Sequence, residues 1–360
     1  MIKRRISKSV RVGNTVIGGG APISVQSMTN TPAADFSSTV EQMRRLEAAG
    51  CDIIRVALPD ESAAEIFTYA ANAGIRVPLV ADVHFDYRIA VAAIRAGASK
   101  IRINPGNIGE EWKVREVADA CRAAGVPIRI GVNGGSLERG LIEKYGSPSA
   151  EAIAESALAQ ADMLEGFGFS DIVISIKSSD VMRMIEASRI VASRTAYPLH
   201  LGVTEAGDSY SGLVKNTCGI ASLLTSGIGD TIRVSLTADP VEEVRAGSEI
   251  LRALGMWERG GVNIISCPTC GRTKIDLIRL VSELRDAVHG IDTHGRTVNV
   301  AVMGCVVNGP GEAREADFGI AGGDGFGVLF RNGEPEGRVA EEDIIDVLVR
   351  EVMRTVGDTD

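Results

Sequence analysis

The 360-residue sequence is poor in aromatic side chains, which make up 4% of it, and it contains only six cysteines. Six scattered cysteines are too few for a disulfide framework, so those that cluster are expected to bind a metal or to act as thiols. No segment approaches the roughly 20 apolar residues that span a bilayer, and no signal-peptide core follows the basic N-terminus, so we expect a cytoplasmic protein. The formal net charge of -9 argues against a general nucleic-acid-binding protein.

Short β-branched runs alternate with helical patterns between residues 23 and 254, which is typical of a parallel sheet with crossover helices. The predicted strands are Ile23–Met28, Asp52–Ala57, Pro78–Asp82, Lys100–Asn104, Pro127–Asn133, Asp171–Lys177, Pro198–Thr204 and Thr231–Leu236. Eight sequential units in about 230 residues fit a closed barrel better than an open doubly wound sheet, and no GxGxxG motif opens the first unit. We therefore predict an α/β fold with a TIM-like (β/α)8 barrel over residues 1–254.

A glycine-rich stretch at residues 255–261 interrupts this repeat and is predicted to be a linker. A chain of this length usually exceeds one core, so a second domain is expected beyond the linker. The predicted elements there are a strand (Val262–Ser266), a helix (Asp276–His289), a strand (Thr297–Met303), a glycine-rich stretch with short strands (Gly304–Arg331) and a helix (Glu341–Val356). Residues 262–360 are therefore expected to form a smaller α+β domain.

Polar side chains recur on one face of the predicted barrel strands. Side chains on a strand alternate between faces, so the isoleucines of Ile101-Arg102-Ile103-Asn104 suit the helix layer while Arg102 and Asn104 point inward. The same reasoning places inside the barrel Arg55, Arg129, Asn133, Lys177, His200, Arg233 and Ser235.

These inward cations have two interpretations. Any single arginine could equally be an ion-paired structural residue. Four arginines and a lysine in one cavity, however, would repel one another and would be costly to desolvate without bound anions. Three acidic residues, Asp82, Asp86 and Glu205, supply part of the counter-charge. We therefore expect a doubly or triply charged ligand, such as a diphosphate, held by bidentate arginine contacts.

Two more residues stand near predicted strand ends. His84 could be a buried packing histidine or a hydrogen-bonding group at the barrel mouth, and its position beyond the third strand favours the mouth. Glu205 ends the seventh strand, where barrel enzymes keep catalytic groups. It could pair with Arg233, but we favour a role as proton donor.

Three cysteines gather in the second domain. Cys267 and Cys270 form a CxxC motif directly after a strand, and Cys305 follows within a glycine-rich segment. In a thioredoxin-like site the pair would begin a helix of a βαβ fold and would need no third cysteine, an arrangement that fits this sequence poorly. A zinc site completed by His289 or His294 and an iron-sulfur cluster both remain open on spacing alone. The other cysteines are expected to be packing residues: Cys51, Cys121 and Cys218.

Six longer motifs resemble the bacterial 4-hydroxy-3-methylbut-2-en-1-yl diphosphate synthase family. They are VQSMTN (residues 25–30), ADVHF (81–85), RINPGN (102–107), RIGVN (129–133), CPTC (267–270) and GCVVNGPGEA (304–313). The similarity runs in order from about Arg11 to Gly323 with no departure at a motif position. The stretch after Gly323 matches only loosely.

The resemblance implies a 4Fe-4S cluster, one per chain, held by Cys267, Cys270, Cys305 and the carboxylate of Glu312. It also implies a two-electron reductive ring opening of 2-C-methyl-D-erythritol 2,4-cyclodiphosphate to 4-hydroxy-3-methylbut-2-enyl diphosphate, with loss of water, in the non-mevalonate isoprenoid pathway. Glu205 is then our candidate proton source. The implied substrate-binding residues are Arg55, Asp82, His84, Arg102, Asn104, Arg129, Asn133, Lys177, His200, Arg233 and Ser235.

The family resemblance further implies flavodoxin or ferredoxin as electron donor and a homodimer with active sites shared between chains. A different class of function is a barrel lyase or aldolase that uses Lys177 as a Schiff-base nucleophile beside a structural zinc domain. A lysine flanked by arginines is more often an anion ligand. A non-catalytic cluster-binding scaffold would leave the polar barrel interior unexplained.

Overall fold

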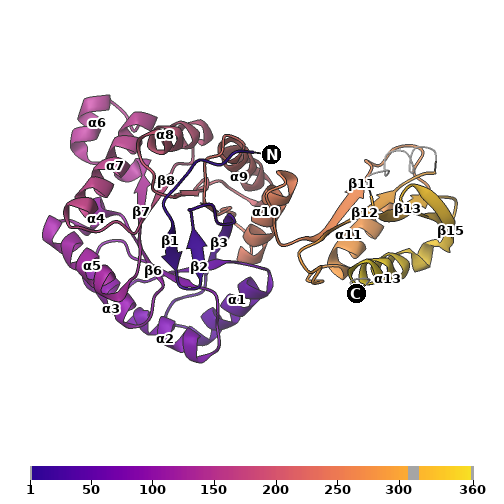
Figure 1. Ribbon diagram of the computed structural model, residues 1–360, viewed down its shortest axis with the longest axis horizontal. Helices are drawn as coiled ribbons and strands as arrows, with labels where there is room; N and C mark the ends of the chain where they lie inside the picture. Colours follow the sequence, from indigo (N-terminus) through magenta and orange to yellow (C-terminus); the bar gives the residue numbers. More distant parts are fainter. Residues whose placement is uncertain (1, 307–315, 358–360) are drawn as a thin grey trace. The chain divides into compact units, whose positions relative to one another are not determined.

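The computed structural model describes residues 2–306 and 316–357. The chain divides into two compact units, Met1–Trp257 and Glu258–Asp360. Figure 1 shows the first as a ring of helices around central strands and the second as a sheet with helices packed on it. None of the helices in the described part of the chain combines the length and the apolarity that a membrane span requires.

The first unit is a closed barrel of parallel strands, which confirms the predicted TIM-like architecture. The strands follow one another around the barrel, and the last pairs with the first to close it. They are β3 (Ser24–Met28), β4 (Ile53–Ala57), β5 (Leu79–Asp82), β6 (Lys100–Ile103), β7 (Ile128–Asn133), β8 (Ile172–Lys177), β9 (Leu199–Leu201) and β10 (Thr231–Ile232). Every predicted strand is present, although β9 and β10 are shorter than predicted.

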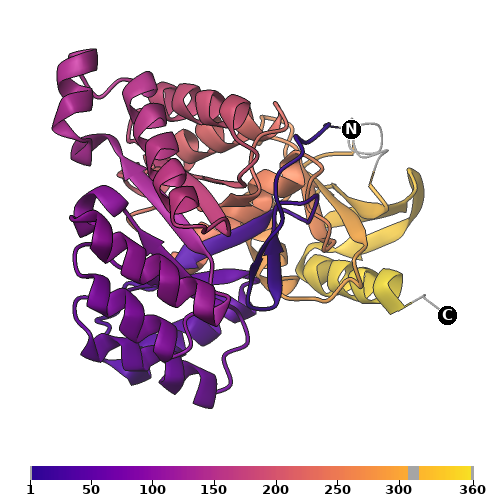
Figure 2. The ribbon, with the colours of Figure 1, turned by 60° about the vertical axis from the view of Figure 1, so that its left-hand side comes forward.

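Helices form the outer layer of the barrel (Figures 1 and 2). The long ones are α1 (Phe36–Ala48), α2 (Glu65–Asn72), α3 (Tyr87–Arg95), α5 (Glu111–Ala124), α7 (Ala150–Gly166), α8 (Val181–Arg194), α9 (Ser209–Leu224) and α10 (Pro240–Ala253), with the shorter α4 (Pro105–Ile108) and α6 (Arg139–Tyr145). Aspartate carboxylates cap the first turns of several, namely Asp35, Asp86, Asp180, Asp208 and Asp239. Such caps satisfy backbone N–H groups that have no partner within the helix, so each helix begins at a defined residue after its strand.

An N-terminal hairpin that the sequence did not predict closes one end of the barrel. Strands β1 (Val10–Val12) and β2 (Thr15–Ile17) pair antiparallel and lie across the ring of strands in Figure 1. Their side chains form an apolar cluster with barrel residues: Val10, Val12, Ile17, Ile53, Val80 and Val173. The barrel members of this cluster sit near the amino ends of β4, β5 and β8. The hairpin therefore covers the amino end of the barrel and leaves the carboxyl end uncovered by it.

The second unit is built on one five-stranded mixed sheet. Its strands are β11 (Gly261–Ser266), β12 (Thr297–Met303), β13 (Phe318–Gly322), β14 (Phe326–Arg331) and β15 (Glu334–Ala340); β11, β12 and β13 are parallel and the other two antiparallel. Helices α11 (Leu277–Ala287) and α13 (Ile344–Gly357) share its apolar core. The predicted strands and helices are present. Strand β15 was missed because its residues are mostly polar and exposed.

Candidate active site

Basic side chains from five places around the barrel lie close together in its interior. Arg55 lies on β4, Arg102 on β6, Arg129 on β7 and Lys177 on β8, and Arg233 directly follows β10. Burial, followed by the charges of Arg102 and Arg55, lowers the pKa of Lys177 to about 6. Burial also lowers the pKa of Arg55 to about 10, and the charges of Arg233 and Arg102 add to that effect. The structure thus brings together the cations that strand alternation placed there.

Asp82, at the carboxyl end of β5, is the carboxylate at the centre of these cations. It lies 2.9 Å from Arg102 Nη1, 3.6 Å from Arg55 Nε and 3.7 Å from His84 Nε2. Burial alone would raise the pKa of Asp82, but Arg55, a hydrogen bond from His84, and Arg102 hold it well below its usual range. Asp82 therefore stays ionised and fixes the orientation of two arginines.

The other two carboxylates predicted to balance the interior arginines, Asp86 and Glu205, do not pair with them. Asp86 caps α3 and pairs with Arg88 at 2.6 Å, so the prediction that it balances the barrel interior is wrong. Glu205 is exposed and makes no ion pair with any described residue. Its φ of 54° is a left-handed conformation that a non-glycine residue rarely adopts outside turns and functional sites.

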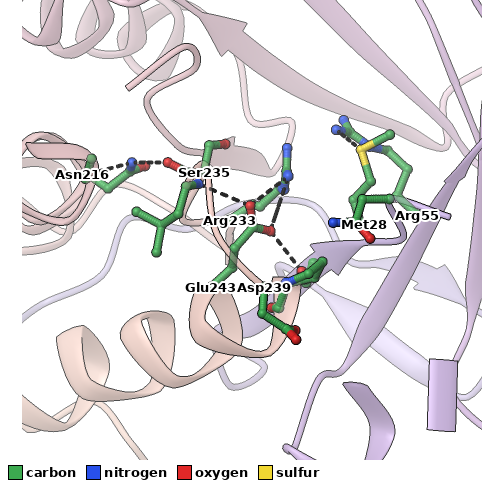
Figure 3. Close-up of polar contacts among 12 residues, drawn as sticks. Met28, Arg55, Asn216, Arg233, Ser235, Asp239 and Glu243 are labelled. Atoms are coloured by element: carbon green, nitrogen blue, oxygen red, sulfur yellow. Dashed lines mark hydrogen bonds and ion pairs between the residues drawn. The ribbon is translucent and has the colours of Figure 1, made fainter. Parts of the chain in front are cut away.

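The second interior counter-charge is Glu243 of α10, which the sequence analysis did not identify. Its carboxylate accepts hydrogen bonds from one edge of the Arg233 guanidinium, from Nη2 at 2.9 Å and from Nε at 3.2 Å (Figure 3). It also accepts a hydrogen bond from Ser27 Oγ at 2.8 Å. The suggested pairing of Glu205 with Arg233 is therefore wrong. The helical periodicity of α10 could have identified Glu243. This residue stands one turn after Pro240 and next to Val244, on the face of the helix that is buried.

The two barrel histidines occupy different environments. The side chain of His84 is 49% exposed, so it lies at the mouth and is not a buried packing residue. His200 is buried on β9, opposite Thr231 of β10. Burial, together with the charges of Arg129 and Lys100, holds the pKa of His200 well below its usual value, so the imidazole is neutral.

Lys100 is a further interior basic residue that the sequence analysis missed. It is fully buried on β6, two residues before Arg102 and on the same face of the strand. Its Nζ has no hydrogen-bond partner among the described residues, and burial and the charge of Arg129 hold its pKa well below the usual value. The same alternation that identified Arg102 would have identified Lys100.

Three predicted polar residues shape the loops at the carboxyl end of the barrel. Asn104 Oδ1 accepts a hydrogen bond from the backbone of Gly106 and caps α4. Asn133 Oδ1 accepts a hydrogen bond from the backbone N–H of Gly135 in the loop after β7. The backbone carbonyl of Ser235 accepts from Asn216 Nδ2 of α9 at 3.1 Å. These contacts fix the loops from which a ligand would be held.

The three cysteines of the second unit start from neighbouring positions. Strands β11 and β12 are parallel and in register, with Ser266 opposite Val302, so the segments after them begin at the same end of the sheet. The backbone N–H of Gly304 points to Cys267 Sγ at 3.3 Å. Thr273 Oγ1 accepts from the N–H of Cys270 and lies against Gly304, where a Cβ would meet Thr273 at 2.9 Å. The CxxC loop therefore folds onto the segment that carries Cys305.

The geometry disfavours zinc ligation by the two histidines considered. His294 precedes β12 while Cys305 follows it, and seven strand residues rise roughly 20 Å. His289 lies beyond the far end of α11, an 11-residue helix roughly 16 Å long that begins after the CxxC loop. Within residues 2–306 and 316–357, no three His, Cys, Asp or Glu side chains stand close enough to hold a metal ion. Glu312 lies outside the described residues.

The remaining cysteines only partly match the prediction that they are packing residues. Cys51 and Cys121 are buried, and burial raises the pKa of the Cys121 thiol. Cys218, on α9, is exposed, so that part of the prediction is wrong. Its helix turns this position towards solvent while Asn216 and Gly219 face the barrel.

Both units of the chain match known protein families. Residues 7–248 match the GcpE TIM-barrel domain, and residues 263–354 match the GcpE protein C-terminal domain. The chain is 55% identical to the 4-hydroxy-3-methylbut-2-en-1-yl diphosphate synthase (flavodoxin) of Caldanaerobacter subterraneus subsp. tengcongensis over 99% of both chains. It is 56% identical to the protein of the same name from Symbiobacterium thermophilum, over 97% of this chain and 93% of that one.

Among solved structures, Yersinia pestis DHPS with a pterine-sulfa conjugate superposes with a TM-score of 0.50 at 11% identity, covering 69% of this chain and 100% of that one. This likeness shows the barrel fold alone. The two matching family models and the full-length relatives lead to one conclusion. The chain belongs to the GcpE family.

Proposed function

We infer that the chain reduces 2-C-methyl-D-erythritol 2,4-cyclodiphosphate to 4-hydroxy-3-methylbut-2-enyl diphosphate. The reaction takes up two electrons and two protons, opens the ring and releases one water. Its place is the non-mevalonate isoprenoid pathway. Membership of the GcpE family and the names of the full-length relatives support this function.

The observation that carries the proposal is the charge balance inside the barrel. The guanidinium groups of Arg55, Arg102, Arg129 and Arg233 face two interior carboxylates, so four minus two leaves two positive charges. A cyclic diphosphate carries two negative charges and presents planar sets of oxygens that suit bidentate arginine contacts. Lys177 adds a fifth positive charge when an anion beside it favours protonation.

The remaining predicted residues are proposed to line the same pocket. His84 at the mouth, Asp82 beside it and the loop residues Asn104 and Asn133 stand at the carboxyl ends of successive strands. His200 and Ser235 complete the set of proposed substrate-binding residues. Barrel enzymes build their active sites at this end.

Glu205 remains our proposed proton source. It stands in the loop after β9, at the end of the barrel where the ligand is proposed to bind. Its left-handed backbone is a local strain of the kind that collects at functional sites. An exposed carboxyl group there exchanges protons readily with solvent, as a reaction that consumes two protons requires.

We propose that Cys267, Cys270, Cys305 and the carboxylate of Glu312 hold a 4Fe-4S cluster, which would supply the electrons. Three thiols at one end of two parallel strands fit the cysteine part of that ligand set. The Gly304 amide directed at Cys267 Sγ is the kind of contact that tunes a cluster potential. Zinc bound through His289 or His294 is disfavoured by their positions, which weakens the alternative of a lyase or aldolase with a zinc domain.

The domain roles follow from this assignment. We propose that residues 1–254 bind the substrate, that residues 255–261 are the linker and that residues 262–360 hold the cluster. We further propose a cytoplasmic homodimer with shared active sites. The relatives' names support flavodoxin as electron donor, and ferredoxin is the alternative.

The test is turnover by protein purified without oxygen. We expect about four iron and four sulfide ions per chain and reduction of the cyclodiphosphate when reduced flavodoxin is supplied. Iron and sulfide analysis, the EPR spectrum and product detection by mass spectrometry measure these outcomes. An active preparation that contains one zinc and no sulfide per chain would remove the cluster from the proposal.

A further inference from the structure

Glu243 is a buried carboxylate that reaches the barrel ligand site from the helix layer. It lies in the first turn of α10, and its side chain is 3% exposed. The neighbouring Glu242 points outward, is 49% exposed and pairs with Arg245. Two adjacent glutamates thus face opposite environments. A buried carboxylate is costly unless its oxygens are satisfied, so the contacts of Glu243 indicate why it is there.

The carboxylate accepts hydrogen bonds from three residues of the barrel. Arg233 donates through Nη2 at 2.9 Å and 3.1 Å and through Nε at 3.2 Å. Ser27 Oγ of β3 donates at 2.8 Å, and the backbone N–H of Leu236 donates at 3.1 Å. Strands β3 and β10 are the pair that closes the barrel. Glu243 therefore holds Arg233 from the helix layer, at the place where β3 and β10 close the barrel. Both of its carboxylate oxygens accept hydrogen bonds.

The opposite edge of Arg233 is left to a ligand. Nε and Nη2 are engaged by Glu243, whereas Nη1 has no hydrogen-bond partner among the described residues. The Arg233 side chain is 18% exposed, against 3% for Glu243, so its open edge faces accessible space. Arg55 is near enough for its pKa to be lowered by Arg233 and raised by Glu243. In Figure 3 the Glu243 carboxylate lies between the Arg233 guanidinium and the start of α10.

We propose that Glu243 is a positioning residue that orients Arg233 for the diphosphate of the substrate. The fork of an arginine loses rotational freedom when it binds an anion, and a carboxylate that already fixes the fork removes that cost before binding. Glu243 acts through Arg233 and does not touch the ligand. The inference rests on the proposed function for the identity of the ligand, but its geometry requires only an anion with phosphate oxygens.

The test measures binding of inorganic pyrophosphate to the full-length protein by calorimetry. Glu243→Gln keeps the size of the side chain and removes its charge, and we expect it to weaken binding by about 10-fold or more, as for the loss of a hydrogen bond to a charged group. Glu242→Gln, one residue away on the exposed face, is the matched control and should leave the affinity unchanged. Unchanged affinity in Glu243→Gln would overturn the proposal.

A double-mutant cycle separates positioning from a general structural role. If Glu243 acts through Arg233, then Glu243→Gln adds no further loss of pyrophosphate affinity in an Arg233→Ala chain. An equal loss in both backgrounds would show a structural effect and would contradict the proposal. Should Glu243→Gln fail to fold, Ser27→Ala removes one contact of the carboxylate without touching Arg233. That variant should also bind pyrophosphate more weakly, and full affinity would overturn the proposal.

Turnover distinguishes failure of this inference from failure of the proposed function. In the cluster-loaded enzyme we expect Glu243→Gln to raise KM for the cyclodiphosphate more than it lowers kcat, with an unchanged EPR spectrum. A wild-type enzyme that binds pyrophosphate but does not reduce the cyclodiphosphate would refute the proposed function alone. A KM equal to that of Glu242→Gln would refute the role of Glu243 alone.

Discussion

The charge of Lys177 depends on what is bound beside it. Burial and the neighbouring charges of Arg102 and Arg55 lower its pKa to about 6, and the nearby carboxylate of Asp82 only partly opposes them. Arg129 also faces this amine and lowers its pKa further. Near pH 7.5 the amine is therefore mostly neutral in the free protein. A phosphate anion placed among the same groups stabilises the ammonium form and raises the pKa.

Binding of an anion should therefore take up a proton at Lys177. Because the pKa is higher in the complex than in the free protein, affinity falls as the pH rises above about 6. Lys177→Arg keeps a positive charge throughout this range and should lose that dependence. The measurement is the ratio of pyrophosphate affinities of the two proteins between pH 5.5 and 8.5, in which ionisation of the ligand cancels. Parallel pH profiles would show that Lys177 does not change its charge on binding.

At the residue scale, sequence reasoning worked where one strand decides the direction of a side chain. Arg55, Arg102 and Arg129 could be placed inside because alternate residues of a strand share a face. Glu243 could not be assigned a partner in this way, because its contact with Arg233 depends on how α10 packs over β3 and β10. Asp86 was misassigned because a helix cap near a strand end has the same spacing as a pocket residue.

At the element scale, the ends of β9 and β10 are held by helix side chains instead of a strand ladder. Asn216 of α9 accepts from the N–H of Val203 at 3.0 Å and donates to the carbonyl of Ser235. Glu243 accepts from the N–H of Leu236. The backbone groups that a longer strand would pair are thus satisfied by side chains, as Figure 3 shows for Ser235. Hydrophobic alternation continues through both segments, so the sequence predicted longer strands than the structure has.

The glycine of β7 makes room for an arginine of β6. A Cβ on Gly131 would stand 2.6 Å from Arg102 Nε and 2.8 Å from Nη2. Arg102 lies there because Nη1 donates to Asp82 at 2.9 Å and Nη2 donates to the carbonyl of Gly131 at 3.3 Å. Gly131→Ala would push the guanidinium away from both partners.

We therefore expect Gly131→Ala to weaken pyrophosphate binding about as much as Arg102→Ala, roughly 1.5–3 kcal/mol for a lost hydrogen bond to a charged group. Gly140→Ala is the control, because that glycine lies in α6 with open space around it and alanine favours the helix. Calorimetric affinities together with melting temperatures separate displacement of Arg102 from unfolding. Wild-type affinity in a folded Gly131→Ala protein would show that Arg102 does not contact the anion.

At the scale of the whole molecule, each unit has its own apolar core, and the proposed site residues of each lie at the carboxyl ends of parallel strands. The sequence predicted this division because the repeat of strand and helix stops at residue 254. It did not predict the β1–β2 hairpin, since two three-residue strands give no periodic signal. That hairpin occupies the amino end of the barrel, to which α10 returns the chain before the linker.

The family resemblance implies a homodimer in which two chains share each active site. In the proposed homodimer, the second unit of one chain would serve the barrel of its partner. Mixing an inactive Arg102→Ala chain with an inactive Cys305→Ser chain tests this arrangement. One centre of the mixed dimer would then combine an intact barrel with an intact cluster domain, so activity should return. A mixture of Arg102→Ala and Arg129→Ala chains is the control, because every barrel in it is damaged and it should stay inactive. If the first mixture also stays inactive although mass spectrometry shows subunit exchange, each chain uses its own cluster.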